Sequence, residues 1–543
     1  MKNILFLITL FITVVLSACF DDKGNYDYHE INELQITGLP EELQVKYRNV
    51  DTLRATPVIE ATADDGSMPD RYSFKWEAVS ELKAGETQTT SYLIGEEENL
   101  SYFVELPDGE YNVNCLVKDT ITRVTWKGTF KLRVTTQLNE GWLVLSDVNG
   151  NARLDLISMS AKEDMVVRDI LQDAPELKGP KKINSVYQMY YNQWGTDLRF
   201  YIVTETATAA LDVATYQWDE ANEIRYEMLE YPADFSATNR TAGMGWELLV
   251  SDKYVFGGTT FGQEVLFGVP INYLTGDNGN YFNVASAVGV NTSSTAMYND
   301  IILYDTSNKR FVKLATGGMR NCELMSVKES LFSWETGKDF VWMENSLYDG
   351  GTTYAILQDT EAPYTRYLYV MGMPSFGAGG AQKKFIELDG YPEIENATCF
   401  AVHPNNPWVF YAVGNTVYYF DLEGHKAEPI HLDSETITML KFNLFRGINS
   451  AYDPVCNALQ RKLIVGSVKS GGELNGVVRT YDLPTVIGDD FVESTMHSGF
   501  GTPVDVTYRE KYDEENIGLC GVYACMLRDL CATYRPIQDW WKN

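Results

Sequence analysis

The chain has 543 residues and a formal net charge of −31, and 45% of its residues are hydrophobic. The hydrophobic share predicts a globular protein rather than a disordered one, and the length suffices for two to four domains. A surface this acidic repels the phosphates of nucleic acids, so we expect no nucleic-acid partner.

The first 18 residues have the layout of a secretory signal peptide: Lys2 supplies a positive start, and an apolar run over residues 4–15 follows. This run is too short to cross a bilayer, which needs about 20 residues. The next segment, Leu16–Cys19, resembles the lipobox of bacterial lipoproteins, in which the cysteine is diacylated and becomes the mature N-terminus. We predict that Cys19 is lipidated and anchors the chain to a membrane. The alternative is an ordinary signal peptide followed by a chance cysteine.

Residues 19–30 form the predicted lipidated tether, which is polar and rich in Gly, Asn and Asp, as suits a flexible segment. Asp21 and Asp22 resemble the export signal that sends some lipoproteins to the outer leaflet of the outer membrane. A solvated acidic tether would have the same sequence. We expect an outer-membrane protein that faces the cell exterior.

Residues 31–136 are predicted to form one Ig/PKD-like β-sandwich. Short segments that alternate apolar and polar residues, such as 72–79 and 109–119, are separated by turn sequences. Trp76 stands where Ig-like sandwiches place a core tryptophan, and Tyr111 resembles the tyrosine of a tyrosine corner. No cysteine precedes Tyr111 within this domain, which excludes a disulfide-bonded Ig core. We expect both aromatic residues to be structural.

Strand pairs recur along residues 137–508, with leading strands that begin near 142, 198, 253, 295, 352, 408 and 461. These steps have the length of a β-propeller blade, and they predict a seven-bladed propeller. Two further β-sandwiches are the alternative architecture, which the regular spacing disfavours. We expect the late strand over 503–508 to close the ring by pairing with the first blade, because closure removes exposed sheet edges.

The C-terminal tail, residues 509–543, has apolar residues at helix-like spacing, and we predict a short helical segment. Its three cysteines, Cys520, Cys525 and Cys531, lack the second pair or the histidines that zinc sites favour. The segment 147–155 resembles an acidic calcium loop, but its Asn-Gly pair is a standard hairpin turn, and we expect a turn. We therefore predict no metal site.

The chain has no HExxH, G-x-S-x-G or P-loop motif. We predict no catalytic residue and no cofactor, and we expect a binding protein. A propeller-based hydrolase or lyase that acts on a polysaccharide remains the alternative, because an active site can assemble from loops without a linear motif.

Aromatic residues near strand ends are the candidate ligand-binding residues, since exposed rings offer stacking surfaces to a glycan or a peptide. Core packing is the alternative for each of them. The candidates are Tyr190, Tyr191, Trp194, Trp334 and Trp342.

Together, the lipobox, the GNYDY tether, the sandwich and the repeat-rich region resemble the PKD-like family of lipoproteins from Gram-negative gut-type bacteria, over residues 16–508. The resemblance implies a companion of outer-membrane nutrient-uptake systems of the starch-utilisation type, and it carries no catalytic residues. We expect a surface lipoprotein that captures a glycan or a peptide together with an outer-membrane transporter complex. A purely structural or adhesion role is the second alternative.

Overall fold

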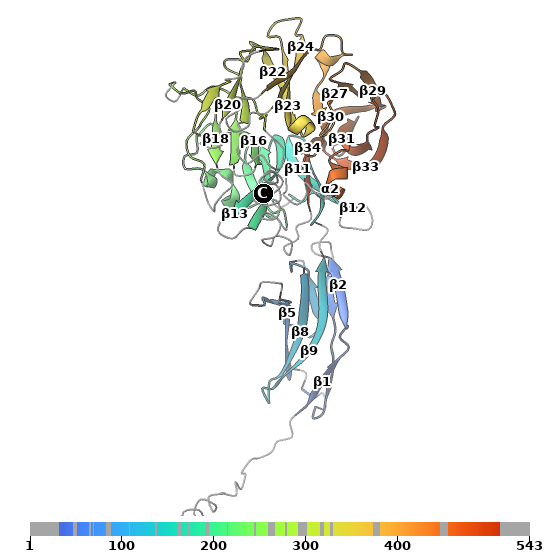
Figure 1. The fold of residues 1–543 in the computed structure, drawn as a ribbon. Helices are drawn as coiled ribbons and strands as arrows, with labels where there is room; N and C mark the ends of the chain where they lie inside the picture. Colours follow the sequence, from blue (N-terminus) through green and yellow to red (C-terminus); the bar gives the residue numbers. More distant parts are fainter. Residues whose placement is uncertain are drawn as a thin grey trace, which may run out of the picture. The chain divides into compact units, whose positions relative to one another are not determined.

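The computed structural model (Figure 1) divides into two compact units, Met1–Thr136 and Gln137–Asn543. Among the residues that it describes, no helix is long and apolar enough to span a membrane. Cys19, Tyr191, Trp194 and the tail from residue 511 lie outside the described residues. The described residues are 32–46, 52–64, 67–68, 70–82, 88–107, 109–135, 138–159, 165–171, 174–190, 195–213, 215–243, 246–258, 266–276, 280–290, 301–314, 320–325, 330–372, 381–445 and 454–510.

The first unit is a β-sandwich whose larger sheet has the strand order β2-β9-β8-β5-β6. Strand β2 runs parallel to β9, and the other neighbours are antiparallel. Two strand pairs, β1-β4 and β3-β7, complete the unit. The strands are β1 (Leu34–Thr37), β2 (Glu42–Lys46), β3 (Thr52–Ala55), β4 (Val58–Ala61), β5 (Tyr72–Ser80), β6 (Ser91–Gly95), β7 (Leu100–Phe103), β8 (Gly109–Asp119) and β9 (Thr125–Thr135).

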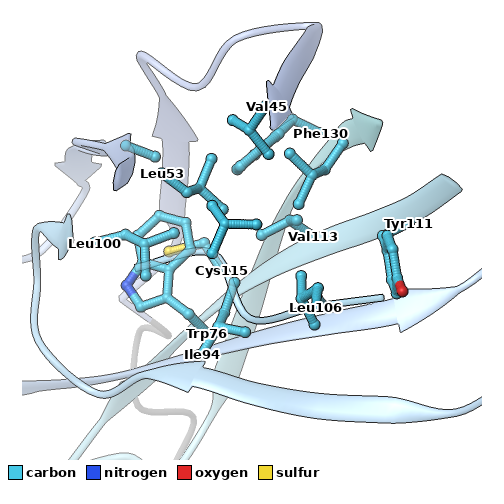
Figure 2. Packing of buried hydrophobic residues seen from close by; sticks show 14 of the residues in the cluster. Val45, Leu53, Trp76, Ile94, Leu100, Leu106, Tyr111, Val113, Cys115 and Phe130 are labelled. Atoms are coloured by element: carbon cyan, nitrogen blue, oxygen red, sulfur yellow. The ribbon is translucent and has the colours of Figure 1, made fainter. Parts of the chain in front are cut away.

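One apolar core fills the sandwich (Figure 2). Alternate residues of β8 enter it, as the period of two in a strand requires. Trp76 is fully buried and donates its indole N–H to the Glu97 carbonyl at 2.8 Å. The Tyr111 hydroxyl donates to the Pro107 carbonyl at 2.8 Å, which confirms the predicted tyrosine corner. Cys115 packs beside Trp76 as a free, buried thiol, so this core holds without a disulfide there.

The second unit is a β-propeller, and its described residues form seven sheets, as the sequence predicts (Figure 1). The first blade contains β10 (Gly141–Val148), β11 (Asn151–Ser158), β12 (Met165–Val167) and β34 (Thr502–Arg509). The three-stranded sheets are the second blade, with β13 (Pro180–Tyr190), β14 (Gly195–Thr204) and β15 (Thr208–Leu211), the third, with β16 (Ala237–Gly243), β17 (Trp246–Ser251) and β18 (Val255–Gly258), and the fourth, with β19 (Ile301–Asp305), β20 (Arg310–Leu314) and β21 (Cys322–Leu324). The four-stranded sheets that follow are the fifth blade, with β22 (Asp339–Ser346), β23 (Thr352–Gln358), β24 (Arg366–Gly372) and β25 (Ala381–Glu387), the sixth, with β26 (Cys399–Val402), β27 (Trp408–Val413), β28 (Thr416–Asp421) and β29 (Lys426–His431), and the seventh, with β30 (Glu435–Lys441), β31 (Leu463–Lys469), β32 (Gly476–Asp482) and β33 (Val492–Phe500).

Each blade buries both faces of its middle strands against its two neighbours. On β23, Tyr354 and Ile356 pack toward the sixth blade, whereas Ala355 and Leu357 pack toward the fourth. This alternation explains why the blade strands are apolar at consecutive positions rather than at every second one. Helical structure within the described residues is short and lies between strands: α2 (Pro454–Leu459), η1 (Glu220–Asn222), η2 (Ile224–Glu227), η3 (Tyr348–Gly350) and η4 (Ile394–Asn396).

The ring closes through β34, which pairs antiparallel with β10 and places Tyr508 opposite Trp142. This confirms the predicted pairing of the late strand with the first blade. The inner strands follow one another around the propeller axis: β13 contacts β34 and β16, and β30 contacts β26 and β34. In the fourth blade, the segment around Gly289 takes the inner place, because Gly289 bridges to Ile302 of β19.

The segment 147–155 forms the predicted hairpin turn between β10 and β11. Asn149 and Gly150 both have positive φ, 55° and 83°, and the Gly150 N–H donates to the Asp147 carboxylate at 2.7 Å. At the other end of the segment, the Asp155 carboxylate accepts from Arg153 at 3.0 Å. The two carboxylates thus have separate structural partners.

Candidate functional site

A cavity of about 690 Å³ opens at the face of the propeller where the inner strands begin, and we call it the inner-strand pocket. Part of its lining comes from the first residues of β13, β16 and β22. Another part comes from the turns that follow β17 and β19, which an antiparallel blade places at this same face. The lining residues are Lys181, Lys182, Thr238, Asp252, Asn283, Val284, Ala285, Ser286, Thr306, Asp339 and Phe340.

Backbone hydrogen bonds fix the wall that residues 283–286 form. The Val284 N–H donates to the Asp252 carbonyl at 2.9 Å, and the Ala285 N–H donates to the Tyr304 carbonyl at 3.0 Å. The Thr306 N–H donates to the Asn283 carbonyl at 2.9 Å. These bonds tie the irregular segment to the third blade and to β19 of its own blade, so that its backbone groups are paired within the propeller.

Three charged lining residues already have partners within the propeller. Asp339 forms an ion pair with Lys309, with 2.8 Å between Oδ1 and Nζ. The Lys181 ammonium donates to the Ser236 hydroxyl at 3.3 Å and to the Ala237 carbonyl at 3.2 Å. Lys182 acts electrostatically on Glu344 of β22. These contacts hold the charged groups at the edge of the pocket.

Four charged residues of four inner strands interact electrostatically, and we call them the axial cluster: Lys182, Glu344, Lys441 and Asp505. Burial raises the pKa of Glu344 to about 7, although Lys441 and Lys182 oppose the rise. The Lys441 ammonium lies 2.5 Å from the Asp505 carboxylate. Lys182 belongs to both the axial cluster and the lining of the pocket, and so connects the two.

Buried and half-buried asparagine side chains join the inner strands to one another. Asn184 of β13 donates to the Arg240 carbonyl of β16 at 2.5 Å, and Asn239 donates to the Ser286 carbonyl at 2.9 Å. Asn345 of β22 accepts from the Val290 N–H at 2.8 Å. Sequence reasoning missed these residues. They matter to the site because they set the spacing of the strands that line it.

The predicted aromatic ligand residues lie away from the inner-strand pocket where the structure describes them. Trp334 is 5% exposed and packs edge-on against Phe332 and Phe311, with ring centroids 5.1 and 6.2 Å apart. Trp342 is half-buried, and its ring lies 5.7 Å from that of Phe400. Tyr190 ends β13, and its side chain, like Tyr191 and Trp194, lies outside the described residues. A ligand role for these residues stays a prediction.

Sequence reasoning also missed the inner-strand pocket. Its lining residues come from four blades, five of them at the starts of strands and six in turns or irregular segments. The one local signal is the pair Lys181-Lys182 at the start of a strand in a chain with a net charge of −31.

Residues 19–178 match the PKD-like family. No curated protein matches the chain significantly. Among solved structures, the chain is similar to a quinonprotein alcohol dehydrogenase-like protein from Bacteroides thetaiotaomicron, with 11% identity, a TM-score of 0.44 and coverage of 89% of this chain and 100% of that one. It is similar to PorZ, a surface component of the type-IX secretion system of Porphyromonas gingivalis, with 14% identity, a TM-score of 0.32 and coverage of 72% and 44%. The WD40 domain of SCAP from fission yeast gives 9% identity, a TM-score of 0.28 and coverage of 59% and 75%.

Proposed function

We propose that this chain is a lipid-anchored binding protein of the bacterial outer membrane, which captures a glycan or a peptide for an outer-membrane uptake system. The observation that carries the proposal is the inner-strand pocket, a cavity of about 690 Å³ lined by eight polar and three apolar residues. Its volume lies in the range of small-molecule sites, and sites of this kind use a few well-placed polar groups for specificity.

The composition of the lining favours binding over chemistry. Its two carboxylates are Asp252 and Asp339, and Asp339 is paired with Lys309 at 2.8 Å. A glycosidase needs two carboxylates that face each other across the scissile bond, one as an acid and one as a base or nucleophile. A carboxylate held by a lysine is less available for proton transfer.

The binding step is tested with the purified full-length protein on an array of glycans and peptides. We expect one class to be retained, and we expect Asp252→Ala to reduce retention because Asp252 lines the pocket. Glu473→Gln is the matched control: Glu473 is an exposed acid in the turn between β31 and β32, on the same face but outside the lining. An array without any retained ligand would overturn the proposed binding function.

The anchor is tested separately in cells. Cys19→Ala should release the protein from the membrane fraction, and external protease should digest the wild-type chain in intact cells. Partnership with a transporter predicts that cross-linking and pull-down of the wild-type chain recover a porin-like membrane protein. Wild-type protein that stays soluble, or that is protected from external protease, would contradict the surface anchor.

A further inference from the structure

Four lining side chains of the inner-strand pocket have polar groups that make no hydrogen bond to any other described residue. They are Asp252, Asn283, Ser286 and Thr306. All four come from the third and fourth blades, and they are exposed or half-buried. Their backbone groups are engaged by the propeller, whereas their side chains remain available to a ligand.

This set combines acceptors and donors at short range. A carboxylate only accepts hydrogen bonds, an amide both donates and accepts, and a hydroxyl does either. The hydroxyl groups of a sugar likewise donate and accept, so neighbouring hydroxyls on one ring complement such a set. A peptide would instead need an open strand edge for its backbone or apolar pockets for its side chains. The apolar lining consists of Val284, Ala285 and Phe340, of which Val284 and Ala285 are buried.

Phe340 supplies an aromatic surface beside the polar set. Its ring is half-buried and lies 5.7 Å from the Tyr304 ring, with 36° between the ring planes. Tyr304 is fully buried, and its hydroxyl donates to the Lys338 carbonyl at 2.5 Å, so the support beneath Phe340 is fixed. A half-buried ring that lines the pocket on a rigid support can pack against the C–H face of a sugar ring.

The charges of the lining argue against an acidic ligand. Its two lysines balance its two aspartates. Lys181 is bonded to Ser236 and Asp339 to Lys309, and Lys182 interacts electrostatically with Glu344. Asp252 is thus the charged group that remains for recognition, and in a chain with a net charge of −31 it would repel an acidic sugar.

We infer that the inner-strand pocket binds neutral sugar rings, with Phe340 against the ring face and Asp252 and Asn283 on its hydroxyl groups. This inference rests on the proposed binding function and narrows it to one ligand class. It also assigns the contacts to residues that lie outside the aromatic set expected from the sequence.

Calorimetric titration of the full-length protein tests the inference with three sets of probes. These are neutral hexasaccharides of glucose, mannose and xylose, a hexamer of galacturonate, and a pool of hexapeptides. We expect a neutral hexasaccharide to bind and the galacturonate hexamer to bind at least about tenfold more weakly. Asp252→Asn and Phe340→Ala should each weaken binding about tenfold or more, and Glu473→Gln should leave it unchanged.

Asp252→Asn keeps the test falsifiable, because Asp252 is exposed and its substitution leaves the packing of the propeller intact. Binding of the peptides or the galacturonate hexamer that Asp252→Asn reduces would overturn the sugar class while the binding function stands. Binding of a neutral hexasaccharide that neither variant changes would overturn the assigned site. If none of the probes binds, both the inference and the proposed function fail.

Discussion

Lys441 of β30 and Asp505 of β34 form an ion pair across the closure of the propeller, with 2.5 Å between Nζ and Oδ1. The other oxygen of Asp505 accepts from the Ile183 N–H of β13 at 3.1 Å. One carboxylate therefore connects the seventh, first and second blades. Both side chains of the pair are largely removed from water, with 24% and 10% exposed.

Asp505→Asn should destabilise the propeller, because it leaves the Lys441 ammonium without its counter-ion in a poorly hydrated place. We expect the free energy of unfolding in urea to fall by about 2–3 kcal/mol. The matched control is Asp482→Asn, which breaks the Lys462–Asp482 pair, whose carboxylate is 56% exposed. That control should cost less than about 1 kcal/mol. Equal losses in the two variants would show that the axial pair has no special role in closure.

Glu344 should make the stability of the propeller depend on pH near neutrality. Burial raises its pKa from 4.5 to about 7, so the folded state holds the proton more tightly than the unfolded state does. The stability that this proton contributes is complete below pH 4.5 and is lost as the pH rises through 7. Wild type should lose stability over this range, whereas Glu344→Gln should not. The free energy of unfolding of the variant, relative to that of wild type, should therefore rise by on the order of 2 kcal/mol between pH 4.5 and pH 8.

The charged residues on the surrounding strands also act on the pKa of Glu344. Lys441 and Lys182 lower this pKa, whereas Asp505 raises it. Glutamine keeps the shape of the protonated acid and its ability to accept from the Val402 N–H. A pH-independent difference between variant and wild type would mean that Glu344 titrates normally in the folded protein.

The tyrosine corner of the sandwich should contribute measurably to the stability of the first unit. Tyr111→Phe removes the hydroxyl that donates to the Pro107 carbonyl at 2.8 Å. We expect a loss of about 1–2 kcal/mol in the free energy of unfolding of this unit, since a carbonyl loses its buried donor. Tyr92→Phe is the control, because Tyr92 lies 6.1 Å from the Tyr111 ring and its hydroxyl has no partner within the described residues. A similar loss in both variants would show that the hydrogen bond of the corner makes no contribution of its own.

The architecture was predictable from sequence because it depends on local patterns. Alternation along β8 marks a sandwich strand, and the regular spacing of apolar strand pairs marks blades. The closing pair β10–β34 was also predictable, since a ring needs a partner for its first blade. Each of the first two signals lies within a stretch of sequence about as long as one blade. The third follows from the closure of the propeller ring.

The candidate pocket was not predictable, because its residues become neighbours only when four blades are in place. Lys182 and Phe340 are far apart in sequence and share one lining. Sequence reasoning instead favoured aromatic residues, and Trp334 shows the difficulty: its ring packs against Phe311 and Phe332. Burial of a large ring is so favourable that a tryptophan near a strand end gives no sure sign of a ligand.

His403 should change the stability of the propeller with pH in the direction opposite to Glu344. It is 4% exposed, and its Nδ1 accepts from the N–H groups of Asn405 and Asn406 at 3.0 and 2.9 Å. Burial lowers its pKa from 6.5 to about 4, with a smaller contribution from Arg461. The neutral ring is therefore favoured in the fold, and its contribution is complete above pH 6.5 and lost as the pH falls through 4.

His403→Asn separates this proton effect from packing. The asparagine oxygen can accept from the same two N–H groups, whereas the ring contacts with Trp408 and Phe442 are lost at every pH. We expect a constant loss of stability above pH 6.5 and a smaller difference from wild type at pH 4, by on the order of 2 kcal/mol. The double variant with Glu344→Gln should lack both contributions to the pH dependence of the free energy of unfolding. The two effects should add, because the two groups bind different protons. Parallel curves for His403→Asn and wild type would mean that the imidazole binds a proton in the folded state as readily as in the unfolded one.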